Sequence, residues 1–176
     1  MSAAVFLDRD GTLNAPVVRD GRSYPPDRAA DLALLDGVAG ACAELSAAGL
    51  KLICITNQPD IARGTQDAGR VAAINARLRD LVALDDIEVC PHDDDDRCAC
   101  RKPLPGMILR AAARHDIDLR RSVTVGDRWR DIEAGRNAGT HTVFIDWGYS
   151  ERRPPSADLT VGDLKESVPW ILKTAR

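Results

Sequence analysis

The chain has 176 residues, enough for one domain with a sizeable hydrophobic core. It carries 24 Lys and Arg against 27 Asp and Glu, a net charge of -3, and has no basic block interleaved with aromatic residues, so a nucleic-acid-binding protein is not expected. No apolar run is long enough to span a bilayer or to serve as a signal peptide, so we expect no membrane partner and a cytoplasmic location.

Five short apolar runs predict β-strands, and the segments between them predict helices. The strands are expected at residues 3–7, 50–56, 122–126, 141–145 and 157–161. Apolar residues recur at helical spacing at Val38, Cys42 and Leu45, and again at Val71, Ile74, Leu78 and Leu81. This alternation predicts an α/β fold in one domain over residues 1–176: a three-layer, Rossmann-like parallel sheet with helices on both faces.

Acidic and hydroxyl side chains follow three of these strands. Asp8 and Asp10 come after the first strand, Thr56 ends the second, and Asp127 and Asp131 follow the third. Ligands of parallel sheets bind at the carboxyl ends of the strands. Carboxylates gathered there repel one another unless a cation lies among them, and oxygen ligands suit Mg²⁺. The pattern therefore predicts a magnesium site at this end of the sheet.

The alternative explanation is that these aspartates only cap turns and helices. For Asp131 and Asp36 taken alone, capping is the favoured interpretation. A lone D-x-D is weak, but Asp8 and Asp10 are followed by Gly11 and are joined by a strand-terminal threonine and a later Gly-Asp pair. This combination is more specific than any of its parts.

A second group of metal-ligand residue types lies within residues 90–103. Cys90, His92, Cys98 and Cys100 form the pattern C-x-H-x5-C-x-C, which fits a structural Cys₃His zinc site with all four positions filled by protein. The alternative is buried free thiols with a surface histidine, and a disulfide framework is disfavoured by the odd number of cysteines.

Such a zinc loop has a consequence for the residues that follow it. A bound metal would order the loop before substrate arrives, which removes a backbone entropy cost of about 1 to 2 kcal/mol per residue. Arg101 and Lys102 would thereby be held in place. The acidic run 93–96 is expected to be a solvated loop that balances nearby cations. Cys42 and Cys54 lie in apolar patterns and are predicted core residues.

Four stretches match, in order, the motifs of the haloacid dehalogenase-like phosphohydrolases. They are DRDGT (8–12), TNQ (56–58), RKP (101–103) and GDRWRD (126–131), and the resemblance spans roughly residues 3 to 146. The zinc loop narrows it to a capless branch that resembles the D-glycero-D-manno-heptose 1,7-bisphosphate phosphatases and the histidinol-phosphatase domains. Two features depart from that pattern: the long, proline-marked segment 15–35, and the pair Arg128 and Trp129.

The resemblance implies a phosphomonoester hydrolase that works through an aspartyl-phosphate. Asp8 would be the nucleophile and Asp10 the general acid and base. Thr56 would donate a hydrogen bond and Lys102 would supply positive charge to the transferring phosphoryl group. Mg²⁺ would be held by Asp8, Asp127 and the backbone carbonyl of Asp10. The residues implied in substrate binding are Arg9, Gly11, Asn57, Gln58, Arg101 and Arg128.

The branch favours a sugar bisphosphate substrate, with removal of the 7-phosphate from D-glycero-D-manno-heptose 1,7-bisphosphate. Arg101 would bind the distal phosphate, with Arg63, Arg19 and Arg22 as weaker candidates. The alternatives are another small sugar phosphate, or histidinol phosphate, for whose amine and imidazole Asp27 or Asp93 are candidates. A phosphatase of proteins or nucleic acids and a zinc-stabilised interaction module also remain. A monomer is expected.

Overall fold

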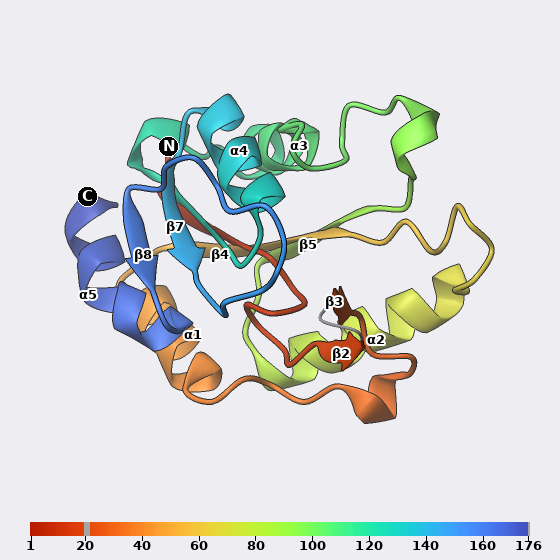
Figure 1. The fold of residues 1–176 in the computed structure, drawn as a ribbon. Coiled ribbons are helices and arrows are strands. Elements are labelled where there is room, and N and C mark those ends of the chain that lie inside the picture. The colour runs from red at the N-terminus through yellow and green to blue at the C-terminus, as the bar shows by residue number, and fades with distance from the viewer. Residues whose placement is uncertain (20–21, 176) are drawn as a thin grey trace.

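The computed structural model describes residues 1–19 and 22–175, with only the backbone of residues 18, 19, 22 and 23. The side chains of Arg19 and Arg22, the weaker candidates for a distal phosphate, therefore lie outside the described part. Six parallel strands form one sheet in the order β5-β4-β1-β6-β7-β8 (Figure 1). Their bounds are β1 (Ala4–Leu7), β4 (Lys51–Asn57), β5 (Asp86–Cys90), β6 (Val123–Gly126), β7 (His141–Ile145) and β8 (Leu159–Val161).

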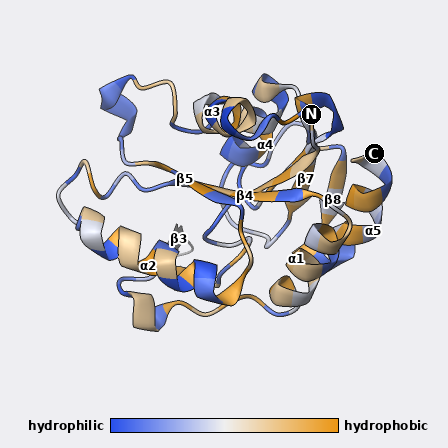
Figure 2. Cartoon of the chain, turned by 180° about the vertical axis from the view of Figure 1, so that it is seen from behind, coloured by the Kyte–Doolittle hydropathy of each residue, from blue (hydrophilic) through white to orange (hydrophobic). Residues whose placement is uncertain are grey.

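Helices cover both faces of the sheet, as the alternation of strand and helix predicts (Figure 1). One face packs against α1 (Val38–Ala47), α2 (Ala68–Leu81) and α5 (Leu164–Thr174), and the other against α3 (Gly106–His115) and α4 (Trp129–Ala138). Successive β1 residues alternate between the two cores, with Val5 on the first side and Phe6 on the second. Inner strands such as β4 and β7 are mostly apolar (Figure 2) because both of their faces are buried.

All five strands predicted from the sequence are present, with ends shifted by at most two residues. The apolar runs did not predict β5, nor the hairpin of β2 (Val17–Arg19) and β3 (Arg22–Tyr24). This hairpin and the short turn Ala29–Asp31 occupy the long segment 15–35, and no larger insertion interrupts the described residues. Cys42 and Cys54 are core residues, 2% and 0% exposed.

Strand β5 could not be predicted from an apolar run because it forms one edge of the sheet and carries acidic residues at two alternate positions. Glu88 is buried and pairs with Arg110 at 2.8 Å and with Arg114 at 2.9 Å. Asp86 pairs with Arg114 at 2.6 Å and with the ring of His115 at 2.8 Å. These basic residues lie on α3, so ion pairs link β5 to this helix in addition to the apolar packing of Cys90.

The register of the three central strands brings their carboxyl ends to the same level. Leu7 of β1 pairs with Cys54 of β4 on one side and with Val125 of β6 on the other. The residues that follow therefore emerge together: Asp8 comes directly after Leu7, Thr56 lies two positions after Cys54, and Asp127 lies two positions after Val125. Within the described part of the chain, no helix is long and apolar enough to cross a membrane.

Candidate active site

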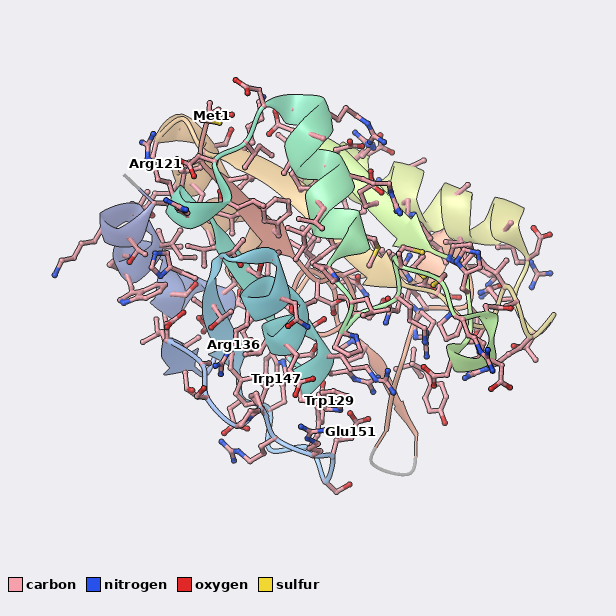
Figure 3. All side chains as sticks on the ribbon, turned by 90° about the horizontal axis from the view of Figure 1, so that it is seen from above. Met1, Arg121, Trp129, Arg136, Trp147 and Glu151 are labelled. Carbon is pink, nitrogen blue, oxygen red and sulfur yellow. The ribbon has the colours of Figure 1, made fainter. Side chains whose placement is uncertain are left out.

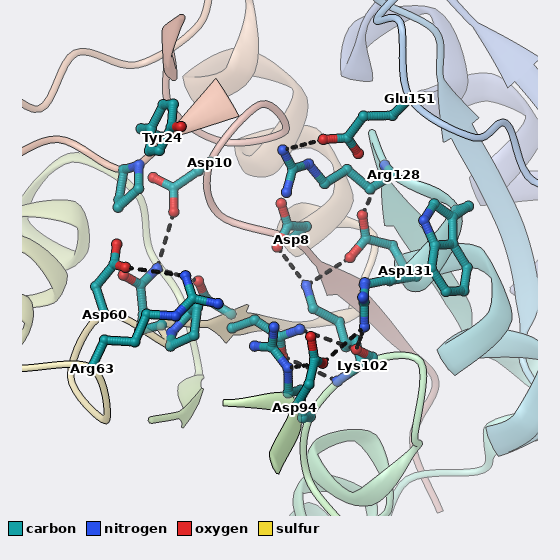
Figure 4. Close-up of a pocket in the computed structure, with 18 of the residues that line it drawn as sticks. Asp8, Asp10, Tyr24, Asp60, Arg63, Asp94, Lys102, Arg128, Asp131 and Glu151 are labelled. Carbon is teal, nitrogen blue, oxygen red and sulfur yellow. Dashed lines mark hydrogen bonds and ion pairs between the residues drawn. The ribbon is translucent and has the colours of Figure 1, made fainter. Parts of the chain in front are cut away.

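A pocket of about 550 Å³ opens at the carboxyl ends of the central strands (Figure 4). Asp8 and Asp10 from the end of β1 and Thr56, Asn57 and Gln58 from the end of β4 lie in its wall. Six cationic residues also line it: Arg63, Arg101, Lys102, Arg128, Arg130 and Arg152. Six acidic residues line it as well: Asp8, Asp10, Asp60, Asp94, Asp131 and Glu151. An anionic ligand would therefore bind where it can replace an acid as the partner of one of these cations.

Lys102 lies at the floor of the pocket and is 3% exposed. Its ammonium donates to Asp8 Oδ1 at 2.5 Å and to the backbone oxygen of Ile55 at 2.9 Å, and it pairs with Asp131 Oδ1 at 2.7 Å. These contacts occupy all three donors of the ammonium group. Burial alone would lower the pKa of Lys102, but the adjacent carboxylates of Asp131 and Asp8 outweigh it and raise the pKa.

The carboxyl group of Asp8 is buried beside other acids. Burial, the main cause, raises its pKa to about 6, with further increases from Asp131 and Asp10 and an opposing effect from Lys102. Asp8 is therefore still mostly ionised at neutral pH. An ionised carboxylate with little water around it is a suitable nucleophile.

Asp127 is the most unusual acid of the site. It is 2% exposed, and neither carboxylate oxygen has a hydrogen-bond partner among the described residues. Burial, then the charges of Asp8 and Asp131, raise the pKa of Asp127 well above its usual value. A buried carboxylate without a donor is costly unless something else compensates its charge.

Asp8, Asp127 and Asp131, here called the carboxylate cluster, place one oxygen each within 4.8 Å of one another. Three oxygens so arranged, one of them from the unpartnered Asp127, fit a hard cation such as Mg²⁺. Capping was the favoured explanation for Asp131 alone, and its Oδ2 does accept from the Arg128 backbone N–H at 3.0 Å. Its other oxygen binds Lys102, so the capping interpretation was incomplete.

Gly11 allows the close approach that this cluster needs. Its φ is +98°, and a Cβ at this position would lie 2.0 Å from Asp127 Oδ2. Its backbone N–H donates to the backbone oxygen of Asn14 at 2.8 Å, and its carbonyl accepts from the Trp147 indole at 2.8 Å. The glycine thus lies against Asp127, and its amide is used within the loop and not directed at a ligand.

Asp10 is held by donors from three residues. Its carboxylate accepts from Arg9, from Asn14 Nδ2 at 3.0 Å and from Gln58 Nε2 at 3.1 Å. Gln58 Nε2 also donates to Thr56 Oγ1 at 2.8 Å. Since the threonine oxygen accepts this bond, its own hydroxyl proton is directed elsewhere.

Two predicted substrate-binding residues have contacts that suit a supporting role. Arg9 is fully buried and is not among the residues lining the pocket, so as it lies here it contacts Asp10 and not a ligand. Asn57 does line the pocket, but its side chain is bonded to the backbone of Lys102, with N–H to Oδ1 at 3.1 Å and Nδ2 to oxygen at 3.2 Å. The two-way bond fixes the chain that carries the lysine.

Cys90, His92, Cys98 and Cys100, here called the thiol cluster, meet beside the pocket at the end of β5. The sulfur–sulfur distances of Cys90 to Cys98, Cys98 to Cys100 and Cys90 to Cys100 are 3.7, 3.5 and 3.0 Å. His92 Nδ1 lies 3.7 Å from Cys90 Sγ and 3.3 Å from Cys100 Sγ. Four ligands around one zinc ion stand roughly 3.5 to 3.8 Å apart, and all five distances come within about 0.5 Å of this range, so the donor set fits Zn²⁺ after a small expansion.

Comparison with known proteins places these motifs in a family. The HAD-hydrolase-like family model matches residues 99–167. A D-glycero-beta-D-manno-heptose-1,7-bisphosphate 7-phosphatase of Bordetella bronchiseptica is 36% identical over 163 residues, covering 90% of this chain and 88% of that protein. An enzyme of the same name from Helicobacter pylori is 33% identical over 174 residues, 96% of each chain. The chain belongs to the haloacid dehalogenase-like phosphatase family.

Solved structures of this family have the same fold. The crystal structure of D,D-heptose 1,7-bisphosphate phosphatase from B. bronchiseptica, complexed with magnesium and phosphate, matches with a TM-score of 0.79 at 31% identity, over 98% of this chain and 99% of that chain. A putative HAD-like phosphatase from Mesorhizobium loti matches with a TM-score of 0.81 at 29% identity, over 99% and 88%. The predicted capless α/β fold of a HAD-like phosphatase is therefore confirmed.

In this HAD-like phosphatase the acidic run 93–96 neutralises the arginines of one pocket wall. Arg63 donates to both oxygens of Asp93, at 2.5 and 2.8 Å, and this bond lowers the pKa of Asp93 to about 2. Arg101 donates to Asp94 at 2.7 Å and to the His92 backbone oxygen at 3.2 Å. A phosphate at Arg101 would therefore compete with Asp94 for the guanidinium.

The opposite wall carries Arg128, a predicted substrate-binding residue, and four residues to which sequence reasoning gave no role: Trp129, Arg130, Glu151 and Arg152. Trp129 is flanked by two guanidinium groups, with Arg130 at 4.8 Å and Arg152 at 4.4 Å from the ring centroid. Arg128 donates to Glu151 at 2.9 Å, which links the start of α4 to the loop after β7. Trp129, Trp147 and Glu151 lie near one another when the molecule is viewed from above (Figure 3). In the sequence, only the departure of GDRWRD from the family pattern pointed to this wall. It did not predict that Arg128 and Trp129 contact Glu151 and Arg152.

Proposed function

We propose that this chain is a Mg²⁺-dependent phosphatase that removes the 7-phosphate of D-glycero-D-manno-heptose 1,7-bisphosphate through an aspartyl-phosphate. The observation that carries the proposal is the carboxylate of Asp8, bonded to Lys102 and next to the unpartnered Asp127, in a pocket with six cationic residues. The substrate comes from the names of the relatives, which cover most of this chain.

In the first step an oxygen of Asp8 attacks phosphorus, and the bond from phosphorus to the sugar oxygen breaks. Asp10 gives its proton to that leaving oxygen. Lys102, held at 2.5 Å from Asp8, offsets the repulsion between the carboxylate and the dianionic ester. Thr56 directs its hydroxyl proton to a phosphoryl oxygen, because Gln58 already occupies an acceptor site on its oxygen.

In the second step water attacks the phosphorus of the aspartyl-phosphate. Asp10, now a carboxylate, removes a proton from that water, and the bond from phosphorus to Asp8 breaks. The product phosphate leaves, and Asp8 regains its ionised form. Asn57 keeps the Lys102 backbone in position through both steps.

Asp8, Asp127 and the backbone carbonyl of Asp10 are the proposed holders of Mg²⁺, and Asp131 lies within the same cluster. When bound, Mg²⁺ neutralises phosphoryl charge and helps to orient the ester. The unpartnered oxygens of Asp127 and the missing Cβ of Gly11 support a cation at this place.

The thiol cluster is the proposed zinc site, with a structural role. All four donors come from the protein, so the site leaves no position for a substrate. It braces the loop that leads into Arg101 and Lys102. We also propose that the chain works as a monomer with a single catalytic domain.

The test is release of inorganic phosphate in the presence of Mg²⁺. D-glycero-D-manno-heptose 1,7-bisphosphate is compared with histidinol phosphate, with Asp8→Asn as the blank and the exposed Asp80→Asn as the matched control. We expect release from the bisphosphate by the wild type and Asp80→Asn, and none by Asp8→Asn. Preference for histidinol phosphate would overturn the sugar substrate. No release from either ester, or equal release by Asp8→Asn, would overturn the mechanism.

A further inference from the structure

The largest fully buried side chain that the proposed mechanism does not use is that of Arg9. Its Nη2 donates to Asp10 Oδ2 at 3.0 Å, and its Nε lies 3.2 and 3.3 Å from the two Asp10 oxygens. Its Nη1 donates to Asn75 Oδ1 at 2.8 Å. Asn75 belongs to α2 and is itself buried. The guanidinium therefore links the general acid and base to a helix outside the pocket.

We infer that Arg9, anchored by Asn75, is a positioning residue that fixes the carboxylate of Asp10 for proton transfer. The inference rests on the proposed function, because it gives Arg9 no contact with substrate. Arg9 lies behind Asp10 and does not line the pocket, whereas Asp10 is 14% exposed toward it.

The physical argument is that neither partner can move alone. Rotation of the Asp10 carboxylate away from Arg9 would leave a buried guanidinium without its counter-charge, which is strongly unfavourable. Rotation of Arg9 would break its buried hydrogen bond to Asn75 Oδ1 and leave both groups without a partner, which is also unfavourable. The forked contact, with Nε donating to Oδ1 at 3.3 Å and Nη2 to Oδ2 at 3.0 Å, also sets the plane of the carboxylate.

The other donors to Asp10 do not replace this anchor. Asn14 and Gln58 each supply one amide bond, at 3.0 and 3.1 Å. Gln58 is in addition shared with Thr56. Of these three donors, only Arg9 is charged, and only Arg9 has a hydrogen bond to a helix residue, Asn75 of α2, among the bonds described. Proton transfer depends on such alignment of donor and acceptor.

The test separates protonation of the leaving oxygen by Asp10 from the other steps of the reaction. First-turnover release of the leaving group is measured for a sugar phosphate, whose alkoxide needs a proton, and for p-nitrophenyl phosphate, whose phenolate needs little help. The variants are Arg9→Gln, Arg9→Lys and Asn75→Leu, each alone, together with Asp10→Asn and the double variant of Arg9→Gln with Asp10→Asn. The exposed Arg77→Gln on the same helix is the matched control.

We expect Arg9→Gln to slow the sugar phosphate at least tenfold with KM nearly unchanged, and the aryl phosphate by less than about threefold. Asn75→Leu should show the same pattern more weakly, Arg9→Lys should recover part of the loss, and Arg77→Gln should match the wild type. The double variant should be no slower than Asp10→Asn, because Arg9 acts only through Asp10.

Equal losses on both esters, or a double variant slower than Asp10→Asn by the full Arg9→Gln factor, would overturn the inference and make Arg9 a structural residue. If Arg9→Gln does not fold, wild-type rates in both Arg9→Lys and Asn75→Leu would overturn it. Failure of the proposed function would appear earlier and differently, as absence of leaving-group release by the wild-type protein from both esters.

Discussion

The carboxylate cluster and the thiol cluster each gather three or four potential metal ligands within a few ångströms, but they are assembled in opposite ways. Asp8, Asp127 and Asp131 come from segments more than a hundred residues apart and meet only because β1 and β6 are neighbours. The thiol cluster comes from eleven consecutive residues, 90–100. The carboxylate cluster therefore depends on the pairing of distant strands, whereas the thiol cluster depends only on the conformation of one loop.

The difference is also energetic. In the carboxylate cluster, like charges are buried together and Asp127 has no donor within the part of the chain that the structure describes. This cluster therefore costs stability that the rest of the fold must supply until a cation binds. The thiols are small apolar groups when protonated, and with a metal they become a cross-link. This difference agrees with the proposed roles, catalysis for the first cluster and rigidity for the second.

The largest expected effect comes from neutralising the unpartnered acid. Asp127→Asn should lower kcat for phosphate release about a hundredfold, because a metal ligand is lost. The same variant should raise the metal-free melting temperature by about 2 to 4 °C, because a buried repulsive charge is removed. Activity and thermal unfolding in chelator are the two measurements. A lower melting temperature would contradict the idea that this cluster costs stability.

Removing one ligand of the thiol cluster should lower stability, the opposite of the effect expected for Asp127→Asn. Cys98→Ser should lower the free energy of unfolding by about 3 kcal/mol through loss of a zinc ligand, and should reduce bound zinc measured by elemental analysis. Cys42→Ser makes the same exchange at a core cysteine outside the cluster and should leave zinc content unchanged. Full zinc content and stability in Cys98→Ser would disprove the structural role.

The third prediction concerns Gly11, whose backbone lies against Asp127 of the carboxylate cluster. Gly11→Ala should destabilise the protein by about 2 to 3 kcal/mol, since the new Cβ meets Asp127 and φ is positive. Displacement of Asp127 should also weaken Mg²⁺ binding. Denaturant unfolding and Mg²⁺ titration measure the two effects, with Gly40→Ala in α1, where a Cβ meets nothing, as the control. Unchanged Mg²⁺ affinity would show that the close approach does not matter.

The smallest effect is the pH dependence of the metal-free protein. The pKa of Asp8 is about 6 in the folded protein against an ordinary 3.8, so the folded state binds more protons between these values and stability falls as pH rises. We expect a loss of about 2 kcal/mol from this group between about pH 4.5 and about pH 7. Saturating Mg²⁺ should therefore raise the melting temperature more at the higher pH. An equal increment at both pH values would exclude the linkage.

The sequence predicted the layers and the ends of the central strands because apolar periodicity reports burial directly. It did not predict β5, whose acidic residues are paired with bases on α3, a segment about twenty residues away. It placed Asp8, Asp10, Thr56, Lys102 and Asp127 at one end of the sheet, and the structure brings them together. The second partner of Asp131 and the burial of Arg9 depend on tertiary contacts that no local pattern encodes.

Strand β5, with one side unpaired, bears on how this protein behaves when it is concentrated. An exposed strand edge is a template on which a second chain can add a strand and start aggregation. The ion pairs of Asp86 and Glu88 with Arg110 and Arg114 lie beside this edge, on the face that α3 covers. A strand that added here would lie next to these charged groups, which disfavour an apolar partner. The acidic residues that made β5 hard to predict would thus also oppose growth of the sheet.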